Sequence, residues 1–377
     1  MNKKELGIYV HIPFCKQKCY YCDFISYSNK YNEIPQYIES LIKEIEAFDF
    51  ENYNVTTIYI GGGTPSYIDS KYIKQILAKI KEKTKYEMAE ITIEVNPGTV
   101  TESKLKDYKE AGINRISIGL QSTKNQLLKQ IGRIHTYEEF LDSYNLAKKV
   151  GFENINVDLM LGLPNQNIND LRESLTKVIY LNPNHISIYS LIVEEGTKIE
   201  NLLEEGKLEL PAEEQERNMY WYVKNTLELN GYQHYEISNF AKKGKESKHN
   251  LNCWNQEEYV GFGTAAHSYI NGVRYSNTEK IEEYIENIKK EKDSIYQIHE
   301  IQTIEEKQKE YMLLGLRKID GVSIAKFKEK FVENPIFLFR KELDILTKEK
   351  LLQVDGDRIK LTNKGLDLAN QVWEQFV

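Results

Sequence analysis

Three of the chain's four cysteines lie within eight residues of one another near the N-terminus. Cys15, Cys19 and Cys22 have the spacing C-x3-C-x2-C and directly follow a short apolar run at 7–12. Three thiolates on one loop can hold three irons of a [4Fe-4S] cluster, which normally takes four cysteine ligands. One iron would then stay open for a small molecule. The spacing therefore predicts a cluster with a free coordination site.

A structural zinc ion is the alternative occupant of this loop. Zinc needs a fourth ligand to complete its tetrahedron, and His11 or Asp23 could supply one. The C-x3-C spacing is nevertheless unusual next to the C-x2-C pairs of zinc ribbons. The cluster is the favoured interpretation.

The flanks of the cysteine motif resemble a known family. The segment YVHIPFC at 9–15 and the CDF at 22–24 are similar to the radical S-adenosylmethionine (SAM) superfamily, and within it to the HemN/HemW branch. The resemblance implies that SAM's amino and carboxylate groups chelate the open iron. It also implies an electron donor, because an electron from the cluster cleaves SAM to a 5′-deoxyadenosyl radical in that superfamily. The similarity is dense over 7–270 and looser beyond.

Six short runs rich in β-branched residues alternate with segments of helical periodicity. This alternation predicts a parallel sheet, and six strand–helix units suit an open, partial (β/α)6 barrel better than a closed eight-stranded one. The resemblance implies the same radical-SAM barrel. The predicted strands are 7–12, 56–61, 90–96, 115–121, 154–161 and 185–192. The predicted helices are 34–48, 70–82, 101–111, 136–149 and 168–181.

Glycines or polar residues stand where four of these strands end, which is where parallel barrels place their functional groups. Gly61-Gly62-Gly63-Thr64-Pro65 follows the second strand, and its glycines let a ligand approach the backbone closely. Glu94, Gln121 and Asp158 stand near the ends of the next three strands. Each alone is more often a satisfied structural group, but their alignment predicts one shared site.

The resemblance assigns SAM contacts to positions of this sequence. It implies that the Gly-Gly-Thr loop holds SAM's amino group, that two tyrosines contact SAM, and that the remaining residues contact its carboxylate, ribose or adenine surroundings. The residue types fit, because arginine pairs bidentately with carboxylates and acidic side chains accept from ribose hydroxyls. The implied contacts are Tyr9, Tyr21, Gly62, Gly63, Thr64, Glu94, Gln121, Arg133 and Asp158.

A second group of motifs follows residue 205. The segments 235–241 (YEISNFA), 249–254 (HNLNCW) and 261–268 (GFGTAAHS) resemble haem-chaperone members of the branch, in which the histidine of the middle motif is associated with haem binding. A histidine in a Lys-, Asn- and Ser-rich loop is usually solvated, yet histidine is also the commonest axial donor to haem iron. The motif makes His249 the candidate haem ligand. The glycine pair at 261 and 263 is predicted to form a turn under the site.

Cys253 stands where the family has a tyrosine. It could be a second soft donor near the haem, a small buried hydrophobe, or a fourth thiolate for the cluster. The last role fits least well, because it would close the iron that SAM needs.

Two functions of different classes follow from the resemblance. The first is a haem chaperone that binds SAM and transfers haem to haem-requiring proteins such as respiratory cytochromes. The second is an oxygen-independent coproporphyrinogen III oxidase, an enzyme that uses the adenosyl radical on propionate side chains. The oxidase branch carries a further cysteine two residues after the third, where this chain has Phe24. The chaperone is therefore favoured, and whether cleaved SAM acts on a substrate is left open.

The chain length of 377 residues exceeds what one hydrophobic core usually serves. We predict a radical-SAM barrel at 1–205, an extension carrying the histidine motif at 206–300, and a C-terminal module at 301–377. The extension should contain helices near 211–229 and 279–293. The module's helices and its hairpin at 351–361, with Asp-Gly at the turn, predict a winged-helix-like end to this α+β part.

Charge and hydropathy restrict the partners. The net charge is −7, and acidic and basic residues nearly balance in the C-terminal module, so no basic stripe favours nucleic acid. No apolar run approaches the ~18 residues of a membrane span, and the N-terminus leaves no room for a signal peptide. The clustered cysteines indicate ligands rather than disulfides. These observations predict a cytoplasmic protein without a transmembrane segment.

Overall fold

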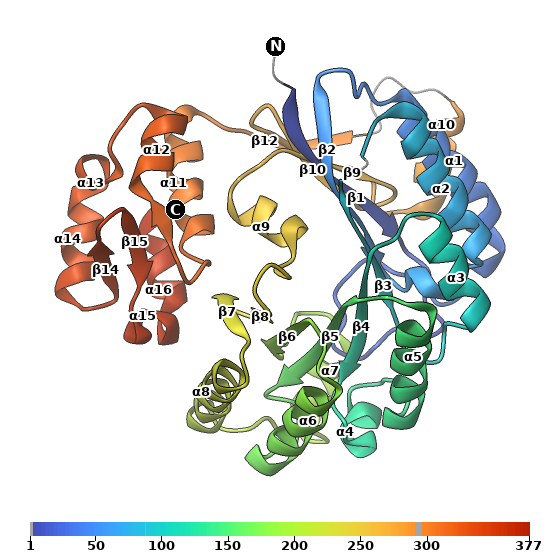
Figure 1. The fold of residues 1–377 in the computed structure, drawn as a ribbon, viewed down its shortest axis with the longest axis horizontal. Coiled ribbons are helices and arrows are strands. Elements are labelled where there is room, and N and C mark those ends of the chain that lie inside the picture. Colours follow the sequence, from blue (N-terminus) through green and yellow to red (C-terminus); the bar gives the residue numbers. More distant parts are fainter. Residues whose placement is uncertain (1–2, 87, 291–295) are drawn as a thin grey trace.

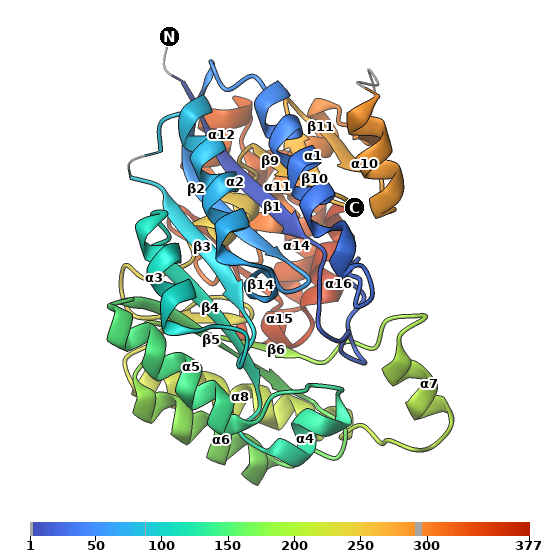
Figure 2. The ribbon, with the colours of Figure 1, turned by 90° about the vertical axis from the view of Figure 1, so that its right-hand side faces the viewer.

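The computed structural model describes residues 3–86, 88–290 and 296–377. Its centre is a curved sheet that contains twelve of the described strands, with helices covering the convex face (Figures 1 and 2). The strand order is β12-β11-β10-β9-β1-β2-β3-β4-β5-β6-β8-β7. The six predicted strands occupy the middle of this order and run parallel, so the α/β partial barrel is confirmed.

The predicted elements match the observed ones to within a few residues. The parallel strands are β1 (Lys4–Ile12), β2 (Tyr53–Gly62), β3 (Glu90–Val95), β4 (Arg115–Gln121), β5 (Asn154–Leu161) and β6 (His185–Ser190). The helices between them are α1 (Ile34–Ala47), α2 (Ser70–Lys83), α3 (Glu102–Glu110), α4 (Asn125–Gln130), α5 (Tyr137–Val150) and α6 (Ile168–Leu181). The short α4 was not predicted, because six residues carry too little periodicity to be recognised.

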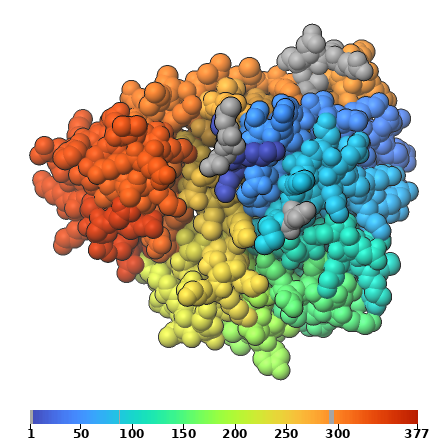
Figure 3. Space-filling view, turned by 45° about the horizontal axis from the view of Figure 1, so that its top comes forward, coloured from blue at the N-terminus to red at the C-terminus, as the bar shows by residue number. Residues whose placement is uncertain are grey.

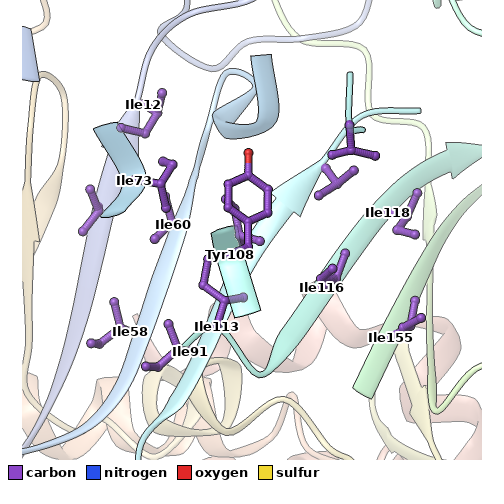
Figure 4. Packing of buried hydrophobic residues seen from close by; sticks show 14 of the residues in the cluster. Ile12, Ile58, Ile60, Ile73, Ile91, Tyr108, Ile113, Ile116, Ile118 and Ile155 are labelled. Atoms are coloured by element: carbon purple, nitrogen blue, oxygen red, sulfur yellow. The ribbon is translucent and has the colours of Figure 1, made fainter. Parts of the chain in front are cut away.

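The two faces of the sheet differ in chemistry because successive side chains on a strand point to opposite faces. Isoleucines such as Ile58, Ile91 and Ile116 are buried on the convex face and pack against the helices (Figure 4). The alternate residues, including Tyr59 and Ser117, point to the concave face and line a cavity. The concave side of the partial barrel is therefore a polar surface.

Residues beyond 205 extend this sheet at both edges. Strands β7 (Gln233–Glu236) and β8 (Asn239–Ala241) join next to β6, while β9 (Tyr259–Phe262) pairs in parallel with β1 and leads to β10 (His267–Ile270), β11 (Val273–Asn277) and β12 (Tyr296–Ile301). Helices α8 (Glu213–Leu229) and α10 (Ile281–Lys289) accompany them, and α7 (Lys198–Glu204) immediately precedes this region.

The predicted boundary near 205 is not a break in the sheet or in the core. Val223, Phe240, Phe262 and Tyr284 belong to the same hydrophobic cluster as the barrel. The prediction of a turn at the glycine pair was wrong for Gly261, which lies in β9, where a Cβ would stand 2.3 Å from the carbonyl oxygen of His267. Positions 291–293 of the helix predicted at 279–293 lie outside the described residues.

The C-terminal module has a hydrophobic core of its own. The predicted hairpin is present, with Asp355 opposite Arg358 across the turn, while the likeness to a winged helix stays a prediction. Helices surround a three-stranded sheet, and Figure 3 shows the module next to the segment around residue 250. Its elements are α11 (Ile304–Gly315), β13 (Val322–Ser323), α12 (Ile324–Phe331), α13 (Pro335–Leu338), α14 (Arg340–Lys348), β14 (Leu352–Asp355), β15 (Arg358–Leu361), α15 (Asn363–Asp367) and α16 (Ala369–Trp373).

Helix α9 (Lys248–Trp254) lies inside the curve of the sheet, between the barrel strands and the C-terminal module (Figure 1). It carries His249, so the segment expected to be a loop is a short helix. The guanidinium of Arg317 lies over the rings of both Trp254 and Trp373 and joins this helix to the module. No helix within the described part of the chain is both long and apolar enough to cross a membrane.

Candidate cluster and ligand site

A cavity of about 530 Å³ opens between the cysteine loop and the polar concave face of the sheet. Eleven of the thirteen residues predicted for the site line it, so segments distant in sequence meet here. These are Cys15, Cys19, Tyr21, Cys22, Gly62, Gly63, Thr64, Glu94, Gln121, Arg133 and Asp158. Tyr9 and His249 are not among the described residues that line this cavity.

Hydrogen bonds to the chain around it fix the cysteine loop. The amide of Cys15 donates to the carbonyl of Tyr27 at 3.0 Å, and the Thr64 hydroxyl donates to Cys15 Sγ at 3.5 Å. Arg133 Nη1 donates to Cys19 Sγ at 3.5 Å. Burial and, to a lesser extent, the neighbouring Cys19 together raise the pKa of the Cys22 thiol to about 11. The Cys22 thiol is therefore protonated at neutral pH until a metal displaces its proton.

The glycine loop after β2 leaves room beside the first cysteine. A Cβ on Gly63 would stand 3.0 Å from Cys15 Sγ and 3.0 Å from the Phe14 nitrogen. Gly62 has a left-handed backbone, with φ at +110°, and a Cβ there would lie 2.6 Å from the His11 ring. Only glycine meets both demands, because other residues rarely adopt that φ and would collide with the imidazole.

A carboxylate next to the glycine loop is held by two donors. Glu94 accepts from the Tyr59 hydroxyl at 2.8 Å and from the Gly62 amide at 3.2 Å. Burial, assisted by the negative charge of the nearby Asp158, raises the pKa of Glu94 to about 7. Burial also raises the pKa of Asp158, which accepts from Asn156 Nδ2 at 2.6 Å. A cationic group entering the cavity would favour the ionised form of both carboxylates.

Gln121 ends β4 in a conformation that costs free energy. Its φ is +70°, in the left-handed region that few residues other than glycine adopt, and the β4–β5 register shifts at this point. Its side chain is buried, lines the cavity and carries an Oε1 atom without a partner among the described residues. A strained residue with an unsatisfied acceptor aimed at a cavity is typical of a ligand contact.

Arg133 is positioned by the end of β4. Its Nη2 donates to Asn96 Oδ1 at 2.9 Å and to the carbonyl of Gly119 at 2.5 Å. A Cβ at position 119 would stand 2.9 Å from Nη2, so the absence of a side chain there lets the guanidinium lie against the strand. The arginine thus presents its charge beside Cys19 in a fixed orientation.

The donor set fits an iron–sulfur cluster. Three thiols line one cavity, an arginine and a hydroxyl already donate to two of the sulfurs, and the opposite wall carries unsatisfied and ionisable groups. Among the described residues, no three His, Cys, Asp or Glu side chains are gathered around a single-ion position. A cluster makes a different demand, because each thiolate binds a separate iron.

Tyr9 and His249 stand behind the wall of the cavity. Tyr9 hydrogen-bonds His11 Nδ1 at 3.0 Å and stacks against Tyr59, which itself lines the cavity. The ring of His249 also stacks against Tyr59, and the two ring centroids lie 5.2 Å apart. Tyr59 therefore lies between the carboxylate of Glu94 and the imidazole of His249.

His249 is buried rather than solvated. Its Nδ1 hydrogen-bonds Thr57 Oγ1 at 2.9 Å, and its amide nitrogen donates to Glu90 Oε1 at 3.4 Å. Burial, assisted by the positive charge of Arg115, lowers the pKa of His249 to about 4. The imidazole is neutral at pH 7, which is the form that binds a metal.

Cys253 lies one turn along α9 from His249. Burial raises the pKa of its thiol to about 11, so it is protonated at neutral pH. It is not among the residues that line the cavity with the other three cysteines.

Several cavity residues on the concave face were not predicted from the sequence. Arg115, Ser117, Asn156 and Tyr189 line the cavity beside the predicted residues. The signal was available, since parallel strands buried on both faces read as continuous apolar runs, whereas RISIGLQ and NINVDLML alternate polar and apolar residues. That alternation marks a polar interior.

Comparisons with known proteins agree with this architecture. The profile of the radical SAM superfamily matches residues 9–178, and that of the HemN C-terminal domain matches residues 303–368. A protein of Lactococcus lactis named "Heme chaperone HemW" is 41% identical over 100% of this chain and 98% of its own length. One of the same name from Bacillus subtilis is 40% identical over 98% of each chain. The chain belongs to the HemW family.

A solved structure from the oxidase branch has the same fold as this HemW family member. The solved structure described as coproporphyrinogen III oxidase (HemN) from Escherichia coli covers 100% of this chain and 91% of that one, with a TM-score of 0.86. The two share 24% sequence identity, so the match concerns the fold. A mitochondrial "Radical S-adenosyl methionine domain-containing protein 1" of Danio rerio is 32% identical over 85% of this chain and 74% of its own length.

Proposed function

We propose that this HemW family member is a haem chaperone that holds a [4Fe-4S] cluster and SAM in the cavity and binds haem for transfer to other proteins. The observation that carries the proposal is the position of His249, a neutral, buried imidazole that is fixed through one nitrogen and stacks on Tyr59, which lines the cavity. The full-length similarity to relatives named as haem chaperones supports it.

Residues 1–205 would hold the cluster and SAM. Cys15, Cys19 and Cys22 would ligate three irons, and the cluster, when bound, supplies an electron and an open iron. Glu94, which accepts a hydrogen bond from the Gly62 amide, would accept another from the amino group of SAM. Gln121 would accept a hydrogen bond from SAM through its unpartnered Oε1. The thiols lose their protons when iron binds, and the adjacent arginine stabilises the resulting negative charge.

Residues 206–300 would bind the haem. The hydrogen bond to Thr57 fixes one nitrogen of His249, which leaves Nε2 as the donor to iron. Cys253 is protonated at neutral pH and would act as a second donor only after losing its proton. Residues 301–377 would form the C-terminal module that covers α9.

The oxidase is the second candidate, since the fold match to HemN covers the whole chain. Phe24, which stands where the oxidase branch has its extra cysteine, lines the cavity and is 64% exposed. A phenylalanine cannot ligate iron, so this position favours the chaperone. The proposal also includes haem-receiving proteins, an electron donor and a cytoplasmic location, which the resemblance implies.

Haem titration followed by the Soret band tests the proposal. We expect the wild type to bind haem, His249→Ala to bind it more weakly, and His249→Ala/Cys253→Ala to bind it weakest. His299→Ala on β12 is a control that removes a histidine outside the site. A double variant that binds like the wild type places the haem elsewhere, and conversion of coproporphyrinogen III by the anaerobic wild type moves the assignment to the oxidase.

A further inference from the structure

The first residue of β4, Arg115, is a buried cation with no hydrogen bond or ion pair to the residues that the structure describes. Its side chain is 2% exposed and lines the cavity, and its Nε is completely buried with no hydrogen bond to the described residues. Burying a guanidinium that lacks a partner is unfavourable, because the charge loses its hydration and gains nothing in return. This arginine is therefore organised for a group that enters the cavity.

The carboxylates nearest to Arg115 do not supply the missing partner, because each is bound to other donors. Glu90 accepts from the amides of Lys248 and His249 at 2.9 and 3.4 Å. Glu94 accepts from Tyr59 and Gly62, and Asp158 from Asn156 and Ser117. No ion pair joins Arg115 to any of them within the described part of the chain. They lower the electrostatic cost of the buried charge without occupying its hydrogen-bond donors.

We propose that Arg115 recognises a carboxylate of the ligand at the end of the cavity away from the cysteine loop. The guanidinium fork matches a carboxylate in bidentate geometry. Gln121 lies six positions along β4 from Arg115, which corresponds to roughly 20 Å at ~3.3 Å per residue. Between them, every second residue of β4 faces the cavity, and these residues, Ser117 and Gly119, also line it. The cavity thus has two recognition ends.

Two sources could supply this carboxylate: a propionate of haem, or the methionine carboxylate of SAM. The position near His249 favours the propionate, since the charge of Arg115 acts on that imidazole and both residues lie around Tyr59. The inference rests on the proposed function for its ligands. It adds a second anchor, which would fix the orientation of a ligand held at iron.

The test compares each ligand with its analogue that lacks the carboxylate, in the full-length protein. The pairs are haem with haem dimethyl ester, and SAM with decarboxylated SAM. The wild type should prefer one carboxylate form by about tenfold or more, and Arg115→Met should abolish that preference while binding of the analogue is retained. Arg115→Lys keeps the charge without the fork and should show an intermediate preference. Arg172→Met, which removes an arginine stacked on Tyr222 outside the cavity, should leave both preferences unchanged.

The two arms distinguish the sources. Loss of preference in the haem pair identifies a propionate, and loss in the SAM pair identifies the methionine carboxylate. A wild type that prefers neither carboxylate form, or an Arg115→Met variant that keeps the wild-type preference in both pairs, overturns the inference. Failure of the wild type to bind haem contradicts the proposed function instead, and the SAM pair then decides the role of Arg115. If Arg115→Met does not fold, Arg115→Lys supplies the comparison.

Discussion

Thr57 Oγ1 lies 2.9 Å from His249 Nδ1, so a residue of β2 fixes the imidazole on α9 across 192 positions of sequence. The contact occupies Nδ1 and leaves Nε2 as the nitrogen that would bind the haem iron of the proposed function. Partners of this kind orient metal-binding histidines and raise their basicity. The relationship explains how a helix of seven residues can present a histidine in one orientation.

Thr57→Val should weaken haem binding about tenfold, because valine keeps the shape of threonine and removes the hydrogen bond. The Soret titration measures the change, and the α-helical circular dichroism signal should stay constant. Thr57→Ser retains the hydroxyl and should bind nearly as the wild type does. Equal haem affinity in the valine and serine variants would show that Thr57 does not position the imidazole.

Replacing Cys15, Cys19 or Cys22 by Ala should abolish the visible absorption of the iron–sulfur cluster after anaerobic reconstitution, because three ligands are already one fewer than usual. Iron and sulfide analysis gives an independent measure. Cys253→Ala is the matched control and should keep its cluster, since this thiol does not line the cavity. Loss of the cluster in the Cys253 variant alone would refute the open-iron site.

Gly62→Ala should lower SAM affinity at least several-fold, because the new Cβ would lie 2.6 Å from the His11 ring and displace the loop. The left-handed backbone alone costs a residue with a Cβ roughly 1–2 kcal/mol. Gly231→Ala separates the two effects, since Gly231 has φ at +82° and nothing within 4 Å of the added carbon. Isothermal titration with SAM should show a loss at position 62 only, and equal losses in both variants would point to strain instead.

Glu94→Gln should change the pH dependence of stability. Burial raises the pKa of Glu94 from its ordinary value of 4.5 to about 7, so the folded state binds this proton more tightly than the unfolded state does. Its contribution to the free energy of unfolding is complete below about pH 4.5 and is lost as the pH rises through about 7. The variant should lack that decline, and urea unfolding between pH 4.5 and 8 measures it.

The same variant should bind SAM about tenfold more weakly at pH 8, where the wild type carries a carboxylate opposite the amino group. Wild-type affinity should rise between pH 6 and pH 8 as Glu94 ionises, in the presence of the nearby Asp158 and Arg115. Affinity of the wild type that falls over this range would assign Glu94 a structural role.

The sequence by itself determined the local features of this protein. Strand and helix positions followed from periodicity, because a strand with one buried face has an apolar residue at every second position and a helix at every third or fourth. The cysteine spacing, the Gly62-Gly63-Thr64 loop and the polar residues at strand ends were visible because each depends on a few consecutive residues. These signals were sufficient to predict the partial barrel and eleven of the residues that line the cavity.

The tertiary structure decided what depends on contacts between distant segments. It placed β9 beside β1 and so joined residues 206–300 to the barrel, which no local pattern specifies. It buried His249 against Thr57 and Tyr59, although its Lys-, Asn- and Ser-rich surroundings predicted exposure. It also left Arg115 unpaired inside the cavity, since the absence of a partner is a property of everything packed around a residue. Pairing and burial of this kind arise only when the chain has folded.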